Sequence, residues 1–479
     1  MRSTFFGIDI ARRALQAQQR ALDVVGHNIA NANTEGYSRQ VAIHQTTPPW
    51  TYPSRHMPAG AGQVGTGVQI VAIQRVRDSF IDMQLRNETE SAGRWEARRD
   101  ALRQVELIFM EPSDLSIRSA LDQFWQSLQD LHQQPESDAA RAVVRERALS
   151  LTATFQHVYK QLTDLQWDLD RLARLDVEKI NSLAERLADV NAQIFRVVNS
   201  GQEPNDLLDR RDQLLLELSE LVDTDVVIHD NKMASVSIGG LSIVNGNHVT
   251  FLRAVPDPAK QDMVTIRWGD TDWVVQVQNG RLAGVLEARD ELVAGYLASL
   301  DRLAAALIEE FNAVHRQGYG LDGSTGVDFF VGTGARDIDL SQDILQSLAK
   351  IAASSRLDAP GDGSNASGAP GDGSNALALA NVYLQPAAGL AGVSMRDFFA
   401  SLISGIGVAA QKANDMVASQ EVLVEHLKNR RDSISGVSLD EEMIDMIRFQ
   451  HAYAAAARVL TAMDEMLDTI ITRLGVVGR

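Results

Sequence analysis

Few stretches of this sequence carry residue types that could do chemistry. The stretch GIGVAA at residues 405–410 has the spacing of a dinucleotide-binding loop, in which free N–H groups at the start of a helix bind pyrophosphate. Such a loop must follow a strand, whereas the preceding FFASLIS predicts a helix. We therefore expect no cofactor at this position.

The stretch LDGSTGVD offers carboxylate oxygens, the ligands that calcium prefers, on Asp322 and Asp328. It lacks the regular acidic spacing and the final glutamate of an EF-hand loop, so we expect a turn. The ten histidines are dispersed, no two of them are four residues apart, and the chain has no cysteine. The sequence therefore predicts no metal site, no disulfide and no thiol nucleophile.

Adjacent carboxylates occur at Glu441 and Glu442 and at Asp464 and Glu465. Neighbouring helix positions point about 100° apart, which does not suit a general acid and base that share one substrate atom. We therefore expect these four side chains to lie on a solvated helix face. No catalytic set of residues can be assembled, and we expect no enzyme activity.

The charge balance favours protein partners. The chain has 45 Lys and Arg against 63 Asp and Glu, a formal net charge of −18, whereas nucleic-acid phosphates need clustered cations. The opening MRSTFFGIDIARRALQ has arginines where a secretory signal needs apolar residues, and no run approaches the roughly 18 apolar residues of a membrane span. We expect no nucleic-acid or membrane partner, and any export to proceed without a cleaved signal peptide.

The clearest pattern is a seven-residue repeat near the C-terminus, in SLDEEMIDMIRFQHAYAAAARVLTAMDEMLDTIITRL. Ser438 and Glu441 have the spacing of a helix-capping box at its start. Apolar residues at intervals of seven, with a second row offset by three or four, form the seam of a coiled coil. The predicted seam residues are Leu439, Met446, Phe449, Tyr453, Leu460, Met463, Leu467, Ile470 and Leu474.

A second seam occurs near the N-terminus, where the second row is interrupted by Gln18. Residues 1–40 carry five arginines against three acids, and residues 438–474 carry three arginines against seven acids, so opposite charge favours pairing of the two ends. The alternative is that both helices complete the core of one globular domain, which the repeats alone leave open. The predicted N-terminal seam residues are Ile8, Leu15, Leu22, Val25 and Ile29.

Between the two seams the sequence predicts long helices and then hairpins. Residues 136–200 contain neither glycine nor proline and repeat apolar residues every three or four positions, which predicts one helix of about 95 Å. Helices are also expected over 77–110 and 117–132, each ended by a proline. From Val226 the period changes to two, which predicts antiparallel hairpins as far as DWVVQVQNGRL, ending near Leu282.

The predicted fold is α+β and mainly α: an elongated out-and-back helical rod with paired N- and C-terminal coiled-coil helices and an inserted antiparallel β domain. A repeated octapeptide, APGDGSNA, occurs at 359–366 and 369–376 and predicts a surface loop. The predicted parts are an N-terminal coiled-coil helix (1–34), linker strands and the first part of a long-helix rod (35–225), a β-rich outer domain (226–283), the returning rod (284–436, with a loop and short-strand insertion at 318–390) and a C-terminal coiled-coil helix (437–479).

Several stretches resemble the axial proteins of bacterial flagella. GHNIANANTEGYSRQ resembles the N-terminal signature of the rod, hook and hook-associated proteins, and the C-terminal repeat resembles their last helix. PNDLLDRRDQLLLELSELV and GYGLDGSTGVDFF resemble the hook-associated protein 1 family in particular. The signature residues are Asn28, Asn31, Asn33, Thr34, Gly36, Tyr37, Arg39 and Gln40.

This resemblance implies a structural, extracellular protein at the junction of hook and filament, exported unfolded by the flagellar type III apparatus. The partners it implies are like subunits in a ring, the hook protein, the second hook-associated junction protein and an export chaperone on the C-terminal helix, with no cofactor. Another axial protein, such as the hook protein itself, is the alternative within the class. An enzyme that uses the loops at 320–380 and an intracellular coiled-coil scaffold are the alternatives from other classes.

Overall fold

A computed structural model describes residues 5–50, 64–109, 116–269, 271–358, 367–369 and 371–473. Helices make up 66% of the residues that the structure describes, and the sheets are small and antiparallel. This confirms the predicted class, a mainly helical α+β protein.

The helices include one of 62 residues, α4. A π-helical segment, Ala288–Val293, connects α6 to α7. The α-helices are α1 (Phe6–Ala30), α2 (Ser79–Phe109), α3 (Ile117–Gln133), α4 (Asp138–Asn199), α5 (Asn205–Leu221), α6 (Gly280–Glu287), α7 (Ala294–His315), α8 (Gln342–Gln346), α9 (Ser374–Val382), α10 (Met395–Ser435) and α11 (Leu439–Arg473).

The strands form two-stranded hairpins and one four-stranded sheet with the order β3-β4-β5-β6. All of their pairings are antiparallel. The strands are β1 (Gln40–Thr46), β2 (Val68–Arg75), β3 (Asp225–Ile228), β4 (Ala234–Ile238), β5 (Leu241–Asn245), β6 (His248–Val249), β7 (Leu252–Pro256), β8 (Val264–Trp268), β9 (Phe330–Val331), β10 (Asp339–Leu340), β11 (Leu357–Asp358) and β12 (Ser367–Gly368).

The chain divides into two compact units. Unit 1 contains residues 1–90, 180–251 and 421–479, and unit 2 contains residues 91–179 and 252–420. Helices α2, α4 and α10 therefore contribute residues to both units. The five-part division expected from the sequence stays a prediction.

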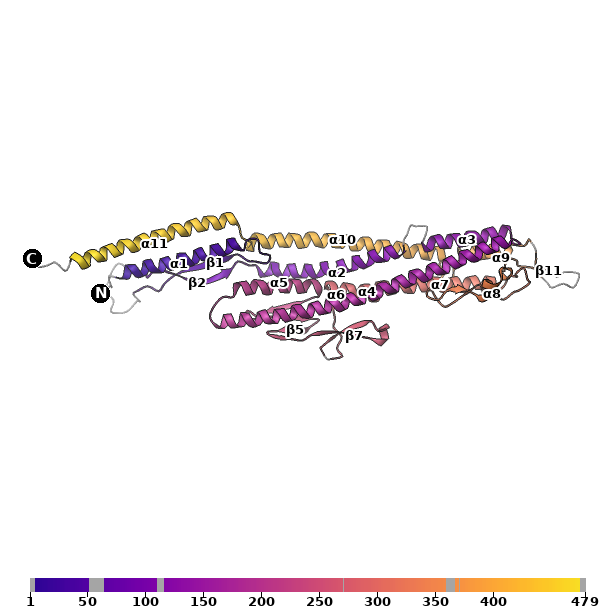
Figure 1. Cartoon of the computed structure of the whole chain (residues 1–479), viewed down its shortest axis with the longest axis horizontal. Coiled ribbons are helices and arrows are strands. Elements are labelled where there is room, and N and C mark those ends of the chain that lie inside the picture. The colour runs from indigo at the N-terminus through magenta and orange to yellow at the C-terminus, as the bar shows by residue number, and fades with distance from the viewer. Residues whose placement is uncertain are drawn as a thin grey trace, which may run out of the picture. The chain divides into compact units, whose positions relative to one another are not determined.

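Unit 1 brings the two ends of the chain together. Helices α1 and α11 lie side by side, and the β1–β2 hairpin packs on α1 (Figure 1). The hairpin pairs Gln40 with Arg75 at one end and Thr46 with Val68 at the other, with a bulge after Ile43. An isolated two-stranded hairpin is marginal in water, so its contact with α1 contributes to its stability.

The side chain of Asn191 in α4 makes three hydrogen bonds to the four-stranded sheet of unit 1. Asn191 Nδ2 donates to the main-chain oxygens of Ala234 and Gly246 over 2.8 and 2.7 Å, and Asn191 Oδ1 accepts from the Ala234 N–H over 2.9 Å. Asn191 is fully buried, so these bonds satisfy main-chain groups that water cannot reach. One asparagine thereby fixes the position of β4 on the helix.

The core of unit 2 is aromatic. Phe329 and Phe330 have ring centroids 4.8 Å apart, and Phe311 of α7 lies 4.9 Å from Phe329. Phe124 of α3 lies 5.5 Å from Phe311. Asn312 fixes the two central rings, because its Oδ1 accepts from the N–H groups of both Phe329 and Phe330. Edge-on and tilted aromatic pairs of this kind add stability beyond the area that they bury.

Three predicted helices are confirmed to within two residues at each end: 77–110 by α2, 117–132 by α3 and 136–200 by α4. Apolar periodicity and the absence of internal glycine and proline were sufficient for α4. The GIGVAA stretch lies inside α10, as the sequence indicated. Asp322 forms a turn in which its Oδ1 accepts from the N–H and the hydroxyl of Ser324.

The strand expected in DWVVQVQNGRL is wrong. Val274 makes one isolated bridge with Arg267, and helix α6 begins at Gly280. The Asn279–Gly280 pair, which predicted a hairpin turn, instead precedes and opens a helix whose Leu282 is fully buried. The apolar run itself, residues 273–277, forms neither a regular strand nor a helix, since only the end of the stretch, from Gly280, is helical.

The first copy of the repeated octapeptide, 359–366, lies outside the described residues. The second copy is built into unit 2 at the start of α9. Asp372 Oδ1 accepts from the Ser374 N–H over 3.0 Å, and buried Asn375 donates from Nδ2 to the Ala352 oxygen over 2.7 Å. A Cβ added to Gly373 would lie 2.2 Å from the main-chain oxygen of His132, so glycine is required there.

Candidate assembly site

Two contacts show that α1 and α11 pair in opposite directions. Near the start of α1, a Cβ added to Gly7 would lie 2.5 Å from Cε of Met463, so the two helices approach closely. Near its end, Asn28 Nδ2 donates to Oε2 of Glu442 over 3.0 Å. Residue numbers rise along α1 while those of the facing residues fall along α11, which makes the pair antiparallel.

The side of α1 that faces α11 carries mostly small side chains. Steps of three and four residues lead along one face of the helix from Gly7 to Asn28. The distance between two packed helices depends on the side chains at their contact, and small ones let the backbones approach. The intervening residues on this face are Ala11, Ala14, Gln18, Ala21 and Val25, of which Ala11, Ala21 and Val25 are buried.

The larger aliphatic residues predicted for the α1 seam lie beside this face. Val25 is buried, whereas Ile8, Leu15, Leu22 and Ile29 are half-buried. Each of these four comes one position after a residue of the Gly7–Asn28 face, and is therefore rotated about 100° around the helix from that face. Both rows repeat every seven residues, so spacing alone does not tell which row faces the partner. Their part in assembly stays a prediction.

The predicted seam of α11 divides by exposure. Most of the predicted seam residues are half-buried beside α1, and the others are exposed to solvent. The half-buried residues are Met446, Phe449, Leu460, Met463 and Leu467, the exposed ones are Leu439, Tyr453 and Ile470, and Leu474 lies outside the described residues.

Asn28 uses all four hydrogen-bonding positions of its amide. Nδ2 donates to the Gln40 main-chain oxygen over 2.9 Å and to Glu442 over 3.0 Å. Oδ1 accepts from the Gln40 N–H over 3.0 Å and from the Tyr37 hydroxyl over 2.8 Å. Burial raises the pKa of Tyr37, so its hydroxyl stays protonated as a donor. An aspartate at position 28 would lose both donated bonds.

Glu442 is a buried carboxylate in the first turn of α11, with 1% of its side chain exposed. Arg39 Nε donates to its Oε1 over 2.7 Å, while Asn28 binds the other oxygen. Arg39 also pairs with Glu441 over 3.1 Å and with Asp445 over 3.8 Å. Burying a carboxylate costs several kcal/mol unless such partners are present. The signature residues supply them.

Glu442 corrects the expectation that Glu441 and Glu442 share a solvated helix face. The Glu441 side chain is 64% exposed, as expected, but Glu442 faces α1. Adjacent helix positions point apart, so one side chain reaches the partner helix while its neighbour reaches water.

The capping box predicted at the start of α11 is incomplete. The Glu441 N–H donates to Ser438 Oγ over 3.5 Å, but the Glu441 carboxylate binds Arg39 instead of the Ser438 N–H.

The turn that follows α1, residues 31–36, is here called the signature turn. The segment after it also binds α5. The N–H and hydroxyl of Ser38 donate to the two carboxylate oxygens of Asp209 over 3.0 and 2.7 Å. Gln40 Nε2 donates to Asp206 over 2.8 Å, and Asn205 Nδ2 donates to Gln40 Oε1 over 3.1 Å. The chain is thus held on one side by α1 and on the other by α5.

Arginines of the β2 strand and its extension balance the acids of α5. Arg75 Nη1 lies 2.6 Å from Asp209 and 3.0 Å from Asp212, and Arg77 lies 3.3 Å from Asp209. Burial by itself would raise the pKa of Asp212, but Arg211, Arg77 and Arg75 together lower it. Asp212 therefore stays ionised at neutral pH.

The remaining signature residues shape the turn after α1. Thr34 Oγ1 donates to Asn31 Oδ1 over 3.3 Å, and Asn31 Nδ2 donates to the His27 main-chain oxygen over 3.0 Å. Gly36 has a φ of 80°, in the left-handed region that glycine adopts without strain. Asn33 is exposed.

Sequence reasoning missed the acids that complete this site. Glu442 was placed in solvent, and Asp206, Asp209 and Asp212 of α5 were not singled out. The available signal was their spacing of three, which places all three acids near one face of a helix. What they bind could not be inferred, because their partners are far away in the sequence.

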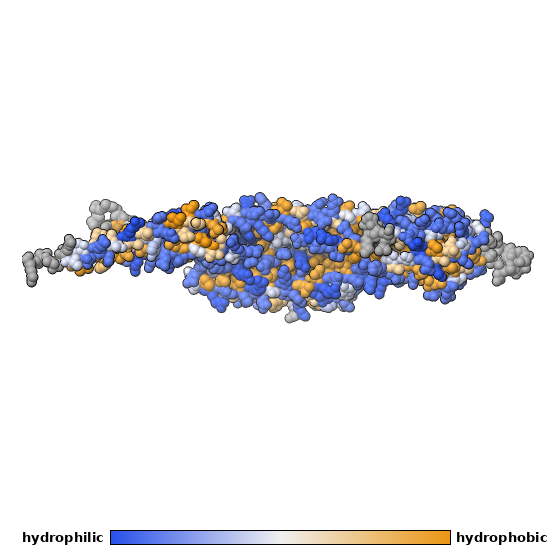
Figure 2. All heavy atoms as spheres, turned by 45° about the horizontal axis from the view of Figure 1, so that its top comes forward, coloured by the Kyte–Doolittle hydropathy of each residue, from blue (hydrophilic) through white to orange (hydrophobic). Residues whose placement is uncertain are grey.

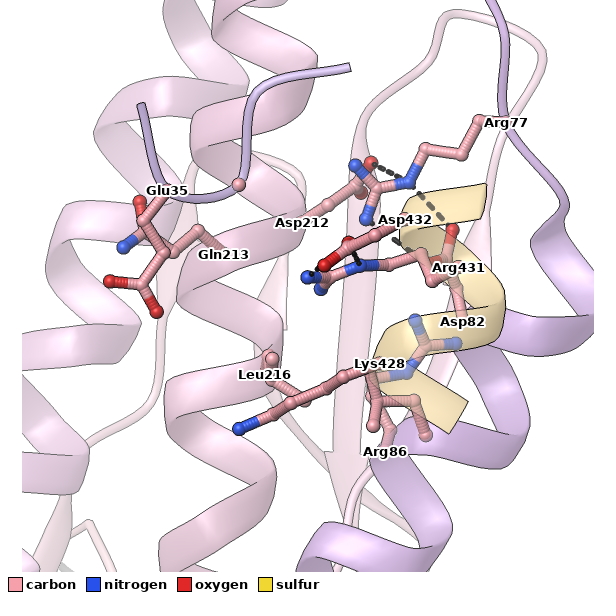
Figure 3. Close-up of a pocket in the computed structure, with 12 residues that line it drawn as sticks. Glu35, Arg77, Asp82, Arg86, Asp212, Gln213, Leu216, Lys428, Arg431 and Asp432 are labelled. Atoms are coloured by element: carbon pink, nitrogen blue, oxygen red, sulfur yellow. Dashed lines mark hydrogen bonds and ion pairs between the residues drawn. The ribbon is translucent and has the colours of Figure 1, made fainter. Parts of the chain in front are cut away.

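A pocket of about 230 Å³ lies beside the signature turn (Figure 3). Glu35 and Gly36 of the turn line it together with side chains of α2, α5 and α10. Arg77 lies 2.7 Å from Asp82 and 3.6 Å from Asp212 at this pocket, so these charges are paired with one another. Its lining includes no histidine, serine or threonine.

The described residues also lack two other kinds of feature, a metal site and a membrane-spanning helix. Among them, no group of three or more His, Cys, Asp or Glu side chains could hold a metal ion. None of their helices is long and apolar enough to cross a bilayer.

Three family models match the chain. Residues 102–330 match the helical domain of flagellar hook-associated protein FlgK. Residues 8–37 match the flagella basal body rod protein family, and residues 430–473 match the C-terminal region of the flagellar basal body rod FlgEFG proteins. The two rod-family matches cover most of α1 with the signature turn, and all of α11.

Relatives match over the full length. The chain is 37% identical to flagellar hook-associated protein 1 of Bacillus subtilis (strain 168) over 100% of both chains. It is 29% identical to that of Escherichia coli (strain K12), over 97% of this chain and 99% of the relative. In fold it is similar to the flagellar hook junction protein FlgK from Burkholderia pseudomallei, with a TM-score of 0.61, 17% identity and coverage of 74% of this chain and 100% of that chain.

These matches confirm the resemblance found in the sequence. The relatives are structural proteins of the flagellum rather than enzymes. The chain therefore belongs to the flagellar hook-associated protein 1 family and is a structural component of the bacterial flagellum.

Proposed function

We propose that this protein forms a ring of like subunits that joins the hook to the filament and is needed for filament assembly. Its other partners are the hook protein on one side and the second hook-associated junction protein on the other. It acts outside the cell, on the flagellum. The full-length similarity to hook-associated protein 1 of Bacillus subtilis supports this assignment over the hook protein itself.

The observation that carries the proposal is an uncovered apolar face on α11. Apolar surface is visible in Figure 2 over the part of unit 1 that Figure 1 labels α1 and α11. Exposed apolar patches rimmed by polar residues mark protein interaction sites. The exposed residues, between 49% and 73% accessible, are Leu439, Met443, Ile444, Ile447, Val459, Met466 and Ile471.

This face needs two partners in succession. Before export it would expose apolar surface in the cytoplasm, where an export chaperone on the C-terminal helix covers it. After export the same residues pack against neighbouring subunits, because burial of apolar area provides roughly 25 cal/mol per Å². Axial assembly thus follows from exchange of one apolar partner for another.

The test replaces one exposed apolar residue of α11 by a charge. Ile447→Asp is expected to leave the subunit folded, because Ile447 is 52% exposed, and to prevent its incorporation at the junction. Ile447→Leu is the matched control, since it keeps an apolar side chain of the same size at the same position. Each variant is expressed in a strain that lacks its own copy, and filaments are counted by electron microscopy.

The expected result is hooks without filaments, with filament protein in the medium, for Ile447→Asp and normal filaments for Ile447→Leu. Normal filament growth with Ile447→Asp would overturn the proposal that this face builds the junction. A continuous tube of this protein, longer than a ring, would favour the alternative, an axial protein of the hook type.

A further inference from the structure

Apolar residues alone do not fix how α1 is aligned along α11. Helix α11 has 35 residues and α1 has 25, so α1 can move seven residues toward the C-terminal end of α11 and still be covered. Gly7 would then face Ile470 rather than Met463. By the same count Ala14 would face Met463 rather than Ala456. A seven-residue shift thus replaces apolar contacts by apolar contacts.

The polar residues distinguish the two alignments. In the observed one, buried Asn28 donates to buried Glu442. After the shift, Asn28 would face Phe449, and its Nδ2 would lose the carboxylate. A buried donor without an acceptor is costly, whereas an apolar contact is nearly indifferent to which apolar residue it meets.

We propose that Asn28 and Glu442 form a register lock, a polar contact that selects one alignment of α1 on α11. Arg39 supports the lock, because it donates to the Glu442 oxygen that Asn28 does not use. Single polar residues in coiled-coil seams are known to specify register at a cost in stability. The inference concerns the helix pair itself and does not rest on the junction role.

Gln18 provides a natural comparison. It is the other polar side chain on the face of α1 directed at α11, and its buried Oε1 has no hydrogen-bond partner among the described residues. A polar atom without a partner does not favour one alignment through a hydrogen bond. The lock therefore depends on the matched pair, and not on polarity in the seam.

Glu442→Leu is the informative variant. It removes the acceptor on α11 but leaves the bonds of Asn28 to Gln40 and Tyr37, so the signature turn keeps its local contacts. Glu442→Gln keeps an acceptor oxygen and should retain the lock. Gln18→Leu should not affect it, since no partner is lost.

Cysteine pairs report the alignment directly, because the chain has no cysteine of its own. Ala14→Cys with Ala456→Cys brings two thiols together in the observed alignment. Ala14→Cys with Met463→Cys does so only after the seven-residue shift, since a disulfide needs Cα atoms within roughly 7 Å. Dilute full-length protein is oxidised, and intramolecular disulfide is quantified by mass spectrometry in each background.

With Glu442 in place, the disulfide of the observed alignment should dominate. Glu442→Leu should raise the shifted disulfide at least about tenfold, the size of effect expected when a buried polar group has lost its partner in both alignments. Glu442→Gln and Gln18→Leu should match the parent.

Three outcomes would overturn the inference. One is a Glu442→Leu protein with as little shifted disulfide as the parent. A second is Gln18→Leu relaxing the alignment as much as Glu442→Leu, which would assign the effect to polarity in general. The third is a parent that forms neither disulfide, because there would then be no alignment to lock.

Discussion

Arg289 Nη1 donates a hydrogen bond to Oδ1 of Asp170 over 2.6 Å, and each side chain is 1% exposed. The same Nη1 donates to the main-chain oxygen of Val264, whose N–H donates back to Asp170 over 2.7 Å. This closed triangle joins strand β8 to helix α4 and to the π-helical segment of unit 2. It satisfies two buried charges and a strand's main-chain groups at once.

Arg289→Met is expected to destabilise unit 2. Removing one partner of a buried ion pair typically costs about 3–5 kcal/mol, and the lower end applies because Arg174 also lies 3.0 Å from Asp170. Adding Asp170→Leu should recover part of the loss, since the uncompensated charge of Asp170 is removed while the Val264 N–H still lacks its acceptor. Urea unfolding, with amide exchange in β8 as the local readout, measures both. An unchanged unfolding midpoint for Arg289→Met would contradict the account.

Unit 2 is expected to lose stability in mild acid through His315. Its Nδ1 donates to the Val327 oxygen over 2.7 Å, and its Nε2 accepts from the Ala352 N–H over 3.0 Å, so the buried ring is neutral. Burial lowers the pKa of His315 to about 4. The unfolded chain binds the proton near pH 6.5, so stability should fall as pH drops from 6.5 toward 4, by about 3 kcal/mol in full.

His315→Gln tests this pH dependence. The variant should be less stable at pH 7, where hydrogen bonds are lost, but its stability should change less between pH 7 and pH 5. Amide exchange around Phe329 and Phe330 follows unit 2 specifically. His451→Gln, at an exposed position of α11, should keep the wild-type change of unit 2 stability with pH. If the stability of His315→Gln changed with pH as much as that of the wild type, this histidine would be excluded as the cause of the acid sensitivity.

Glu90 should make the stability of unit 1 depend on pH in the opposite sense, with less stability at higher pH. Its Oε1 accepts from the N–H and the hydroxyl of Thr224 over 2.9 and 3.0 Å. Burial raises the pKa of Glu90 to about 7, with Asp223 adding to the rise and Arg86 opposing it. The folded state thus holds a proton that the unfolded state releases near pH 4.5. Stability is full below that pH and should be lost, by about 3 kcal/mol, as pH rises through 7.

Glu90→Gln should stabilise unit 1 at pH 8 by up to about 3 kcal/mol and flatten its pH dependence. The amide oxygen of glutamine can still accept both bonds from Thr224, because both go to one oxygen. Glu220→Gln, at an exposed position of α5, is the control and should change little. Amide exchange of α5 at pH 5.5 and pH 8 measures the effect. Wild-type protection that increases with pH would contradict it.

Two helical glycines should respond oppositely to alanine. A Cβ added to Gly284 of α6 would lie 2.4 Å from the Arg94 main-chain oxygen and 2.9 Å from the Ala97 Cβ, so Gly284→Ala should cost about 1–3 kcal/mol. Gly295 of α7 has open space at its Cβ position, so Gly295→Ala should stabilise by about 0.5–1 kcal/mol through helix propensity. Thermal unfolding of both variants compares them. Equal effects would refute close packing of α6 on α2.

The sequence predicted the helical part of the fold well because its signals are local. Periodic apolar residues without glycine or proline specified α4, and Pro112 and Pro135 indicated where the preceding helices end. The short apolar run after Trp268 carried no such signal. Residues 273–277 make one isolated bridge to β8 instead of a regular strand, and the helix begins only at Gly280, where Gly284 packs against α2.

The candidate site could be predicted only in part. The signature residues were identified from their resemblance to flagellar proteins, but that resemblance did not show which of them are buried. Glu442 lies more than 400 residues from Asn28 and Arg39 in the sequence, so no local pattern shows that it leaves solvent to bind them. The acids of α5 were missed for the same reason.

The amino-acid sequence by itself determined that two heptad helices at opposite ends of the chain need a partner, because apolar periodicity is a local property of each helix. Only the tertiary structure decided which row of α1 faces α11 and which carboxylate is buried between them. Residues at equivalent heptad positions are interchangeable in the pattern. They differ only in the neighbours they meet, and those neighbours come from distant parts of the chain.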